Sequence, residues 1–212
     1  MQRAELKALR EDVVARAREA FARMDEVAEY NTRKVLDAMR ACRVSDAHFG
    51  VSAGYAYSDL GREKLDELYA RVFGAEQALV RTQFVSGTHA LATVLFGILR
   101  PGDQLVSITG APYDTMQTVI GWVGSLKEFG VRYEELPMRG GRVDMEGIGR
   151  IVTARTKLAL VQRSRGYSER EPLSIKDIRM VSARIKAANP NCIVFVDNCY
   201  GEFVDTVEPT EI

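Results

Sequence analysis

The stretch CIVFVD, residues 192–197, decides the fold class of this chain. Its four central residues, Ile193 to Val196, are all apolar, which is typical of a strand in a sheet with helices packed on both faces. Further strands are predicted at residues 77–81, 104–109, 131–136 and 158–163, with helical patterns between them at 88–99, 114–128, 144–153 and 174–188. This alternation predicts an α/β fold with a mostly parallel, doubly wound sheet.

The N-terminal part of the sequence has a different pattern. Apolar side chains recur at helical spacing and predict two helices, with Asn31 as the N-cap of the second. A loop of small and aromatic residues follows at 45–57, and a helix is expected from Ser58 to a C-terminal cap at Gly74. We therefore expect N-terminal helices and an active-site loop in residues 1–75 and an α/β domain in residues 76–212.

The composition argues against several classes of protein. The 29 basic and 29 acidic side chains cancel, so no overall field recruits nucleic acid or an anionic membrane. No apolar run approaches the roughly 18 residues of a spanning helix, and the charged N-terminus lacks a secretion signal, which predicts a soluble cytoplasmic protein. The cysteines lack CxxC spacing and the histidines have no partner at ligand spacing, so we expect no disulfide framework and no metal site.

The end of the sequence is unusual for a parallel sheet. The strand that ends at Asp197 is followed by fifteen residues with an acidic, proline-containing tail. A sheet that stopped there would leave an edge that natural proteins usually pair or cover. We therefore expect this sequence to be the N-terminal portion of a longer protein.

The first candidate site is the start of a predicted helix, at Ser86, Gly87 and Thr88. Unpaired amides and hydroxyl groups at a helix start can hold a phosphate, and a glycine lets it approach the backbone. The alternative, given equal weight, is that Ser86 or Thr88 only caps the helix. The motif is neither GxGxxG nor a Walker A loop, so it does not specifically indicate a dinucleotide or a nucleoside triphosphate.

Three further candidates follow predicted strands, at the edge where ligands of open α/β sheets bind. Asp197 is expected to be removed from water, which favours a cationic ligand or a metal; the alternative is an acidic cap on the next turn. Tyr113 can stack on a flat ring or pack as a turn aromatic. Arg163 and Arg165 can hold an anionic group or close a solvated turn. With the helix start, these residues describe a pocket for an aromatic cation that carries a phosphate, and pyridoxal 5'-phosphate fits that description.

Several long stretches of the sequence resemble a known family. From about residue 30 onward the chain resembles the methionine gamma-lyase family, also described as cystathionine beta-lyase-like proteins involved in aluminium resistance. The resemblance is carried by residues 54–115 (GYAYSDLGREK to GAPYDT), GSLKEFG (124–130), VQRSRGYSEREPLSI (161–175) and VFVDNCYGEFVDTVEPTE (194–211). It implies the large domain of a fold-type-I pyridoxal-phosphate-dependent transferase, incomplete at its C-terminus, with an N-terminal helical segment, in a homodimer or homotetramer.

The resemblance also implies roles for single residues. The phosphate-binding turn is matched by Ser86, Gly87 and Thr88, the aromatic residue stacked on the pyridine ring by Tyr113, and the acid paired with the ring nitrogen by Asp197. Tyr57 resembles a tyrosine that such enzymes place in the active site of a neighbouring subunit. Related lyases have an arginine two residues later, where this chain has Asp59, and Arg62 is the nearest replacement.

The lysine that the family uses for catalysis is not found at a matching position. Enzymes of this fold type form a Schiff base with a lysine that follows the strand bearing the acid, whereas the last lysine here, Lys186, precedes that strand. The resemblance implies that the missing lysine comes after residue 212. We therefore expect the N-terminal part of a carbon–sulfur lyase acting on a sulfur-containing amino acid by β- or γ-elimination, with this chain alone inactive.

Asp197 and Tyr57 are the expected catalytic residues, Tyr57 as a general acid or base near the leaving group. Arg163 or Arg165 is expected to contact the cofactor or a substrate carboxylate. Two alternatives from other classes remain at this point. One is a non-catalytic association module with the same fold. The other is a Rossmann-type nucleotide-binding enzyme, against which the missing glycine fingerprint counts.

Overall fold

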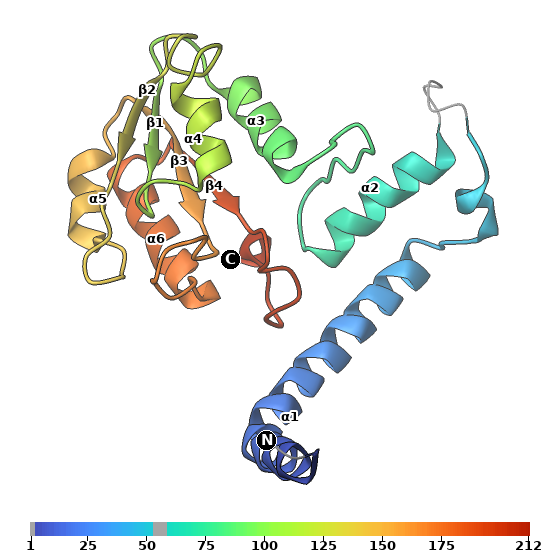
Figure 1. The fold of residues 1–212 in the computed structure, drawn as a ribbon. Helices are drawn as coiled ribbons and strands as arrows, with labels where there is room; N and C mark the ends of the chain where they lie inside the picture. The colour runs from blue at the N-terminus through green and yellow to red at the C-terminus, as the bar shows by residue number, and fades with distance from the viewer. Residues whose placement is uncertain (1–2, 53–58) are drawn as a thin grey trace. The chain divides into compact units, whose positions relative to one another are not determined.

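The computed structural model describes residues 3–52 and 59–212 of the chain (Figure 1). The chain divides into two compact units. The first contains residues 1–80 together with 203–208, and the second contains residues 81–202 together with 209–212.

A four-stranded parallel sheet forms the centre of the second unit. Its strands are β1 (Gln104–Ser107), β2 (Arg132–Glu135), β3 (Thr156–Gln162) and β4 (Ile193–Asp197), in the spatial order β2-β1-β3-β4. Every neighbouring pair is parallel, and the register between β3 and β4 ends with Gln162 opposite Asp197. The predicted parallel sheet is therefore confirmed.

Helices cover both faces of this sheet, as a doubly wound fold requires (Figure 1). They are α3 (Gly87–Ile98), α4 (Asp114–Gly121), α5 (Met145–Ile151) and α6 (Ile175–Ala188), and a 3-10 turn, η2 (Pro209–Glu211), follows near the end of the chain. Successive residues of a strand point to opposite faces, so Leu105 packs in a cluster with α3 and α4 while Val106 packs with α5 and α6. Leu158 and Ala159 of β3 divide between the two clusters in the same way.

Two expectations for the strands need correction. The apolar residues of β4 are half-buried rather than fully buried, because β4 pairs with β3 on one side only among the described strands. The described backbone over residues 77–81 forms no strand. There the amide of Val80 donates to the Asp66 side chain at 2.8 Å, so this backbone donor bonds to a helix side chain instead of to a neighbouring strand.

The first unit contains a helix of 39 residues, α1 (Arg3–Ala41), so the prediction of two helices divided at Asn31 is wrong. Asn31 lies inside α1 and is buried. Its side-chain amide donates to the backbone oxygens of Phe203 and Asp205, both at 3.0 Å. These contacts come from residues far away in the sequence, so they stabilise a polar residue inside a helix where local preference favours a cap.

The 3-10 turn η1 (Asp46–Phe49) and the helix α2 (Leu60–Val72) complete the regular structure described in the first unit. The predicted cap at Gly74 is confirmed. Gly74 has φ = +60°, and the amide of Ala75 donates to the oxygen of Ala70 at 2.8 Å. A left-handed glycine just after the last helical residue is a common way to end a helix.

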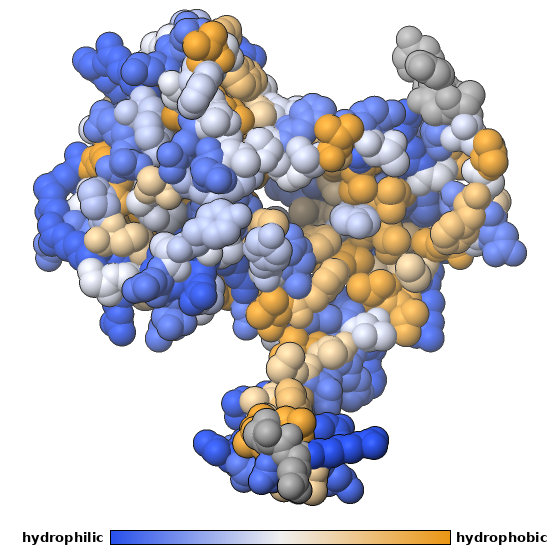
Figure 2. Space-filling model, in the orientation of Figure 1, coloured by the Kyte–Doolittle hydropathy of each residue, from blue (hydrophilic) through white to orange (hydrophobic). Residues whose placement is uncertain are grey.

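Apolar side chains are also exposed along α1, and orange atoms mark hydrophobic residues on the molecular surface in Figure 2. The exposed apolar residues of α1 include Leu6, Leu9, Val13, Phe21 and Met24. Within the part of the chain that the structure describes, no helix is both long enough and apolar enough to cross a membrane.

Leu158 offers a test of the central position of β3. It is fully buried, so Leu158→Ala is expected to lower the free energy of unfolding by about 2–5 kcal/mol through lost burial and a residual cavity. The matched control is Lys157→Ala, because Lys157 is exposed on the same strand and its replacement is expected to change stability by at most about 0.5 kcal/mol. Urea unfolding of both variants measures the difference, and equal losses would contradict the assigned packing.

Candidate active site

The start of α3 leaves backbone donors open. Ser86 is the N-cap of this helix, and its hydroxyl accepts a hydrogen bond from the amide of His89 at 3.1 Å. No hydrogen-bond partner is found for the amides of Gly87 and Thr88 among the residues described. A Cβ atom built at Gly87 would meet nothing within 4 Å. The helix start therefore combines a side-chain cap with two open amides and free space, as an anion site requires.

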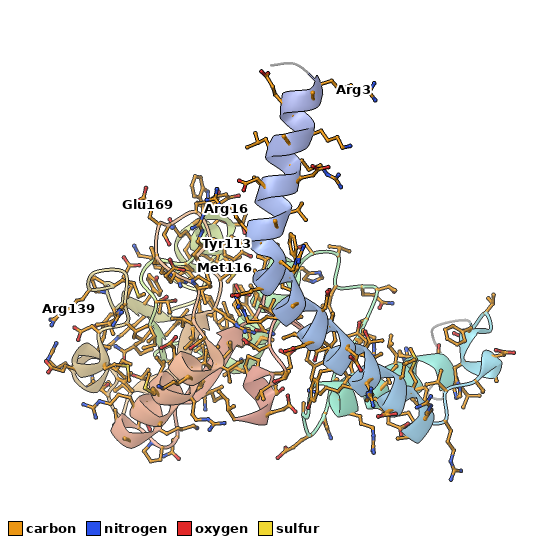
Figure 3. The ribbon with its side chains drawn as sticks, turned by 90° about the horizontal axis from the view of Figure 1, so that it is seen from below. Arg3, Arg16, Tyr113, Met116, Arg139 and Glu169 are labelled. Carbon is orange, nitrogen blue, oxygen red and sulfur yellow. The ribbon has the colours of Figure 1, made fainter. Side chains whose placement is uncertain are left out.

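Hydroxyl groups gather beside this helix start. The Thr88 hydroxyl lies 3.1 Å from the Tyr113 hydroxyl and 2.9 Å from the Thr115 hydroxyl. Tyr113 is the N-cap residue of α4, and Figure 3 labels it together with Met116, a buried residue of the same helix. Thr115 was not among the site residues predicted from the sequence, although its place in the first turn after Tyr113 was a usable signal.

Gln162 connects this hydroxyl cluster to the strand that carries Asp197. The side-chain oxygen of Gln162 accepts a hydrogen bond from the amide of Tyr113 at 3.1 Å. Gln162 is the last residue of β3 and lies opposite Asp197 in the register with β4. The contacts from Thr88 through Tyr113 and Gln162 to Asp197 thus place the helix start, the tyrosine and the acid along one edge of the sheet. This is the carboxyl edge, where open α/β sheets bind ligands.

Asp197 is a buried carboxylate with little stabilisation from the protein. It is 7% exposed, and one of its oxygens accepts a hydrogen bond from the amide of Cys199 at 3.1 Å. No lysine, arginine or histidine of residues 3–52 and 59–212 forms an ion pair with it. Burial raises the pKa of Asp197, the nearby charge of Glu202 raises it further, and the Cys199 amide opposes both effects. A positively charged ligand group would relieve this unfavourable state.

Arg163 and Arg165 occupy different environments. Arg163 is buried, and its guanidinium donates to the side-chain oxygen of Asn198 at 2.9 Å and to the backbone oxygen of Gly201 at 2.7 Å. A Cβ atom at Gly201 would lie 2.6 Å from the Arg163 side chain, so a larger residue there would force that side chain to shift. These contacts give Arg163 a structural role in the turn after β4, and its contact with a cofactor or substrate stays a prediction.

Arg165 is exposed and lines a hollow of about 440 Å³ on the carboxyl edge. The hollow is formed by the turn after β1 and the loop after β3, and its lining includes Tyr113, Gln162, Tyr167 and Arg170. Arg170 was missed by the sequence analysis because it lies in a polar loop without periodicity. It is buried and donates to the backbone oxygens of Gln162, at 2.9 Å, and Ser164. Burial lowers the pKa of Arg170 from its ordinary value.

Tyr57 lies outside the described residues, so its proposed part in catalysis stays a prediction. Asp59, at the position where related lyases have an arginine, is the N-cap of α2. Its carboxylate accepts hydrogen bonds from the Ser52 hydroxyl at 2.5 Å and from the Arg62 amide at 3.0 Å. The departure from the family pattern therefore has a local structural role at the start of α2.

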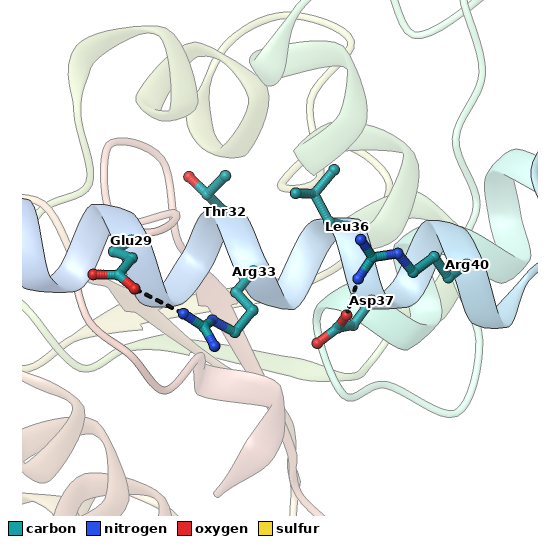
Figure 4. Close-up of a pocket in the computed structure, with 6 residues that line it drawn as sticks. All are labelled: Glu29, Thr32, Arg33, Leu36, Asp37 and Arg40. Atoms are coloured by element: carbon teal, nitrogen blue, oxygen red, sulfur yellow. Dashed lines mark hydrogen bonds and ion pairs between the residues drawn. The ribbon is translucent and has the colours of Figure 1, made fainter.

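A second hollow, of about 500 Å³, lies along α1 (Figure 4). It is lined by Glu29, Thr32, Arg33, Leu36, Asp37 and Arg40, all from one helix. Its charges pair along the helix, Arg33 with Glu29 at 2.8 Å and Arg40 with Asp37 at 2.9 Å. These exposed pairs indicate an ordinary solvated helix surface and not a site for chemistry.

The four-stranded parallel sheet with helices on both faces matches an incomplete fold-type-I α/β domain. The sequence model of the family described as methionine gamma-lyase matches residues 6–212. The chain therefore belongs to the methionine gamma-lyase family, which confirms the resemblance found in the sequence.

Individual relatives agree with this assignment. The uncharacterized protein YnbB of Bacillus subtilis is 44% identical over 195 residues, which cover 89% of this chain and 46% of YnbB. A solved structure from Clostridium novyi is named as a carbon-sulfur lyase involved in aluminum resistance. It is 43% identical to this chain with a TM-score of 0.93, and the match covers 98% of this chain and 51% of the Clostridium novyi chain. A Listeria monocytogenes structure, named as a candidate cystathionine beta-lyase involved in aluminum resistance, is 47% identical with a TM-score of 0.93 over 97% of this chain and 53% of its own. The chain spans about half the length of these relatives.

The raised pKa of Asp197 predicts how stability depends on pH. The folded chain keeps a proton on Asp197 at pH values where the unfolded chain, with an aspartate pKa of about 3.9, has lost it. Stability is therefore lost as the pH rises from that value through the raised pKa of the folded chain, and the penalty is complete above it. Asp197→Asn removes the penalty and can still accept from the Cys199 amide.

We expect Asp197→Asn to be more stable than the wild-type chain at neutral pH, with a difference that shrinks as the pH falls toward about 4. Urea unfolding of both proteins from about pH 3 to about pH 8 measures this effect. If Asp197→Asn instead proves less stable than wild type at neutral pH, the carboxylate is stabilised where it lies and the assigned penalty is wrong.

Proposed function

We propose that this chain supplies the cofactor-binding part of a pyridoxal-phosphate-dependent carbon–sulfur lyase. The observation that carries the proposal is Asp197, a buried carboxylate without a cationic partner among the described residues. Contacts through Gln162 and Tyr113 connect its strand to the open helix start at Gly87 and Thr88. One edge of the sheet thus offers a place for a cation and a place for an anion, which suits a protonated pyridine that carries a phosphate.

Each part of the cofactor would have a matching group in this arrangement. The open amides of Gly87 and Thr88 and the hydroxyls of Thr88 and Thr115 would bind the phosphate. Tyr113 would lie against the ring, and Asp197 would hold the proton on the ring nitrogen. When bound, pyridoxal phosphate supplies an electron sink for the negative charge that forms on the substrate. Asp197 would strengthen that property, because its carboxylate would keep the ring nitrogen protonated.

The substrate class rests on the relatives. The Clostridium novyi protein is named as a carbon-sulfur lyase and the Listeria monocytogenes protein as a candidate cystathionine beta-lyase. We propose that the intact enzyme acts on a sulfur-containing amino acid of the cystathionine or methionine type. We also propose that it works as a homo-oligomer in the cytoplasm, where Tyr57 of one subunit reaches the site of a neighbour and acts as a general acid or base. Of the two candidate arginines, Arg165 is the better placed to contact the cofactor or the substrate, because it lines the hollow beside Tyr113.

No lysine is among the described residues that line the hollow on the carboxyl edge. Lys186 lies in the last turn of α6 and donates to the backbone oxygens of Cys192, at 2.8 Å, and Pro190, at 3.2 Å. Those residues precede β4, whereas Asp197 ends it. Lys186 is therefore bound at the opposite end of the strand. We propose that the 212-residue chain binds the cofactor without turning over a sulfur amino acid.

Calorimetric titration with pyridoxal phosphate tests the proposal. We expect the chain to bind pyridoxal phosphate, to bind pyridoxal more weakly because the phosphate contacts are lost, and to show no binding of NAD. Asp197→Asn is expected to weaken binding of pyridoxal phosphate by about 10-fold or more, since a hydrogen bond to a charged group contributes about 1.5–3 kcal/mol. Binding of NAD without binding of pyridoxal phosphate would support the Rossmann alternative and overturn the proposal.

Thr88 provides the matching test at the phosphate end. Thr88→Val removes a hydroxyl next to the open amides and is expected to weaken binding of pyridoxal phosphate by about 10-fold while binding of pyridoxal changes less. The control is Thr93→Val on the same helix, where the hydroxyl is exposed and donates to the His89 oxygen at 2.8 Å. An equal effect of both variants would argue against a phosphate site at the start of α3.

A further inference from the structure

Gln162 uses every polar group it has at the carboxyl edge of the sheet. It is 6% exposed, and its backbone amide donates to the Thr109 hydroxyl at 3.1 Å while its backbone oxygen accepts from Arg170 at 2.9 Å. Its side-chain oxygen accepts from the Tyr113 amide at 3.1 Å, and its side-chain nitrogen donates to the Ser164 oxygen at 3.2 Å. One side chain therefore joins the turn after β1 to the loop after β3.

The loop after β3 packs closely on this side chain. Gly166 has φ = +57°, and a Cβ atom there would lie 3.0 Å from the Gln162 side-chain nitrogen and 4.0 Å from the Cβ of Tyr113. The glycine thus lets the loop backbone approach both residues. Because Gln162 also lies opposite Asp197 in the sheet, its backbone is fixed relative to the acid by the strand register.

The side-chain amide of Gln162 bonds to two backbone groups at once. The Tyr113 amide donates to the side-chain oxygen of Gln162, and the Ser164 oxygen accepts from the Gln162 side-chain nitrogen as well as from Arg170. A primary amide offers this acceptor and this donor at the end of one side chain. A carboxylate supplies the acceptor but no donor, and an aliphatic side chain supplies neither. When the Gln162 amide is removed, the Tyr113 amide loses this acceptor, which is costly, whereas the Ser164 oxygen keeps its hydrogen bond from Arg170.

We propose that Gln162 is a positioning residue of the cofactor site. Its side-chain amide holds the backbone of Tyr113 level with Asp197 at the edge of the sheet, so that the aromatic ring and the carboxylate can contact the same flat ligand. This inference rests on the proposed function and adds to it the link between the two groups. Gln162 itself makes no contact with the ligand in this scheme. It acts through Tyr113 and through the loop that carries Arg165.

A second buried glutamine separates positioning from general stability. Gln104 is 7% exposed and lies at the start of β1, at the opposite edge of the same sheet. Its side-chain nitrogen donates to Glu134 at 2.6 Å, and its side-chain oxygen accepts from Thr156 at 2.6 Å. Gln104 therefore resembles Gln162 in burial and in hydrogen bonding, but it lies away from Tyr113 and Asp197.

The experiment compares Gln162→Leu, Gln162→Glu and Gln104→Leu in the 212-residue chain. Thermal unfolding reports stability, amide hydrogen exchange reports whether the Tyr113 amide stays protected, and calorimetry reports affinity for pyridoxal phosphate. Both leucine variants are expected to lose stability. Gln162→Leu alone should lose protection of the Tyr113 amide and bind pyridoxal phosphate about 10-fold more weakly. Gln162→Glu should keep the Tyr113 amide protected, because its carboxylate still accepts that hydrogen bond.

The outcomes distinguish this inference from the proposed function. A wild-type chain that does not bind pyridoxal phosphate would overturn the proposed function and with it the ligand to be positioned. If the wild-type chain binds pyridoxal phosphate and Gln162→Leu binds it equally well, the positioning role of Gln162 is wrong and the proposed function stands. An equal loss of affinity in Gln104→Leu would also overturn it, because the effect would then follow from stability and not from position.

Discussion

The negative charge of Asp197, held out of water at the end of β4, is the constraint on which the rest of this account depends. A buried carboxylate is stable when a cation or several hydrogen bonds compensate it. Among the described residues, one backbone amide donates to Asp197, and burial leaves its pKa raised. The protein thus keeps an unfavourable charge at the position where parallel sheets bind ligands. Such a group lowers the stability of the free chain and is expected where binding or catalysis requires it.

The parallel sheet explains how the other groups come to lie near this charge. Each parallel strand ends at the same edge, so the turn after β1, the loop after β3 and the turn after β4 meet there although they are far apart in the sequence. Hydrogen bonds then fix these segments more exactly than the sheet alone. Gln162 joins the first two segments, and Arg163 ties the loop after β3 to the turn after β4.

The sequence predicted the features that arise from local pattern. Apolar runs indicated the parallel sheet, and Gly74 indicated the end of a helix. It failed where tertiary contacts override local preference, as at Asn31, whose polar side chain is stabilised inside α1 by residues more than 170 positions away. The link through Gln162 could not be predicted either, because the partners of its side chain depend on strand order and register. The grouping of Asp197 with the other strand ends, in contrast, followed from the parallel topology alone.

The most direct test is to measure the pKa of Asp197 itself. A pH titration with and without pyridoxal phosphate gives this pKa from the carbon-13 chemical shift of the carboxyl group. We expect the pKa of Asp197 to be raised in the free chain by burial and to fall clearly when the cofactor binds, because a protonated ring nitrogen favours the ionised carboxylate. A pKa that stays unchanged while the cofactor binds would contradict the pairing of Asp197 with the ring.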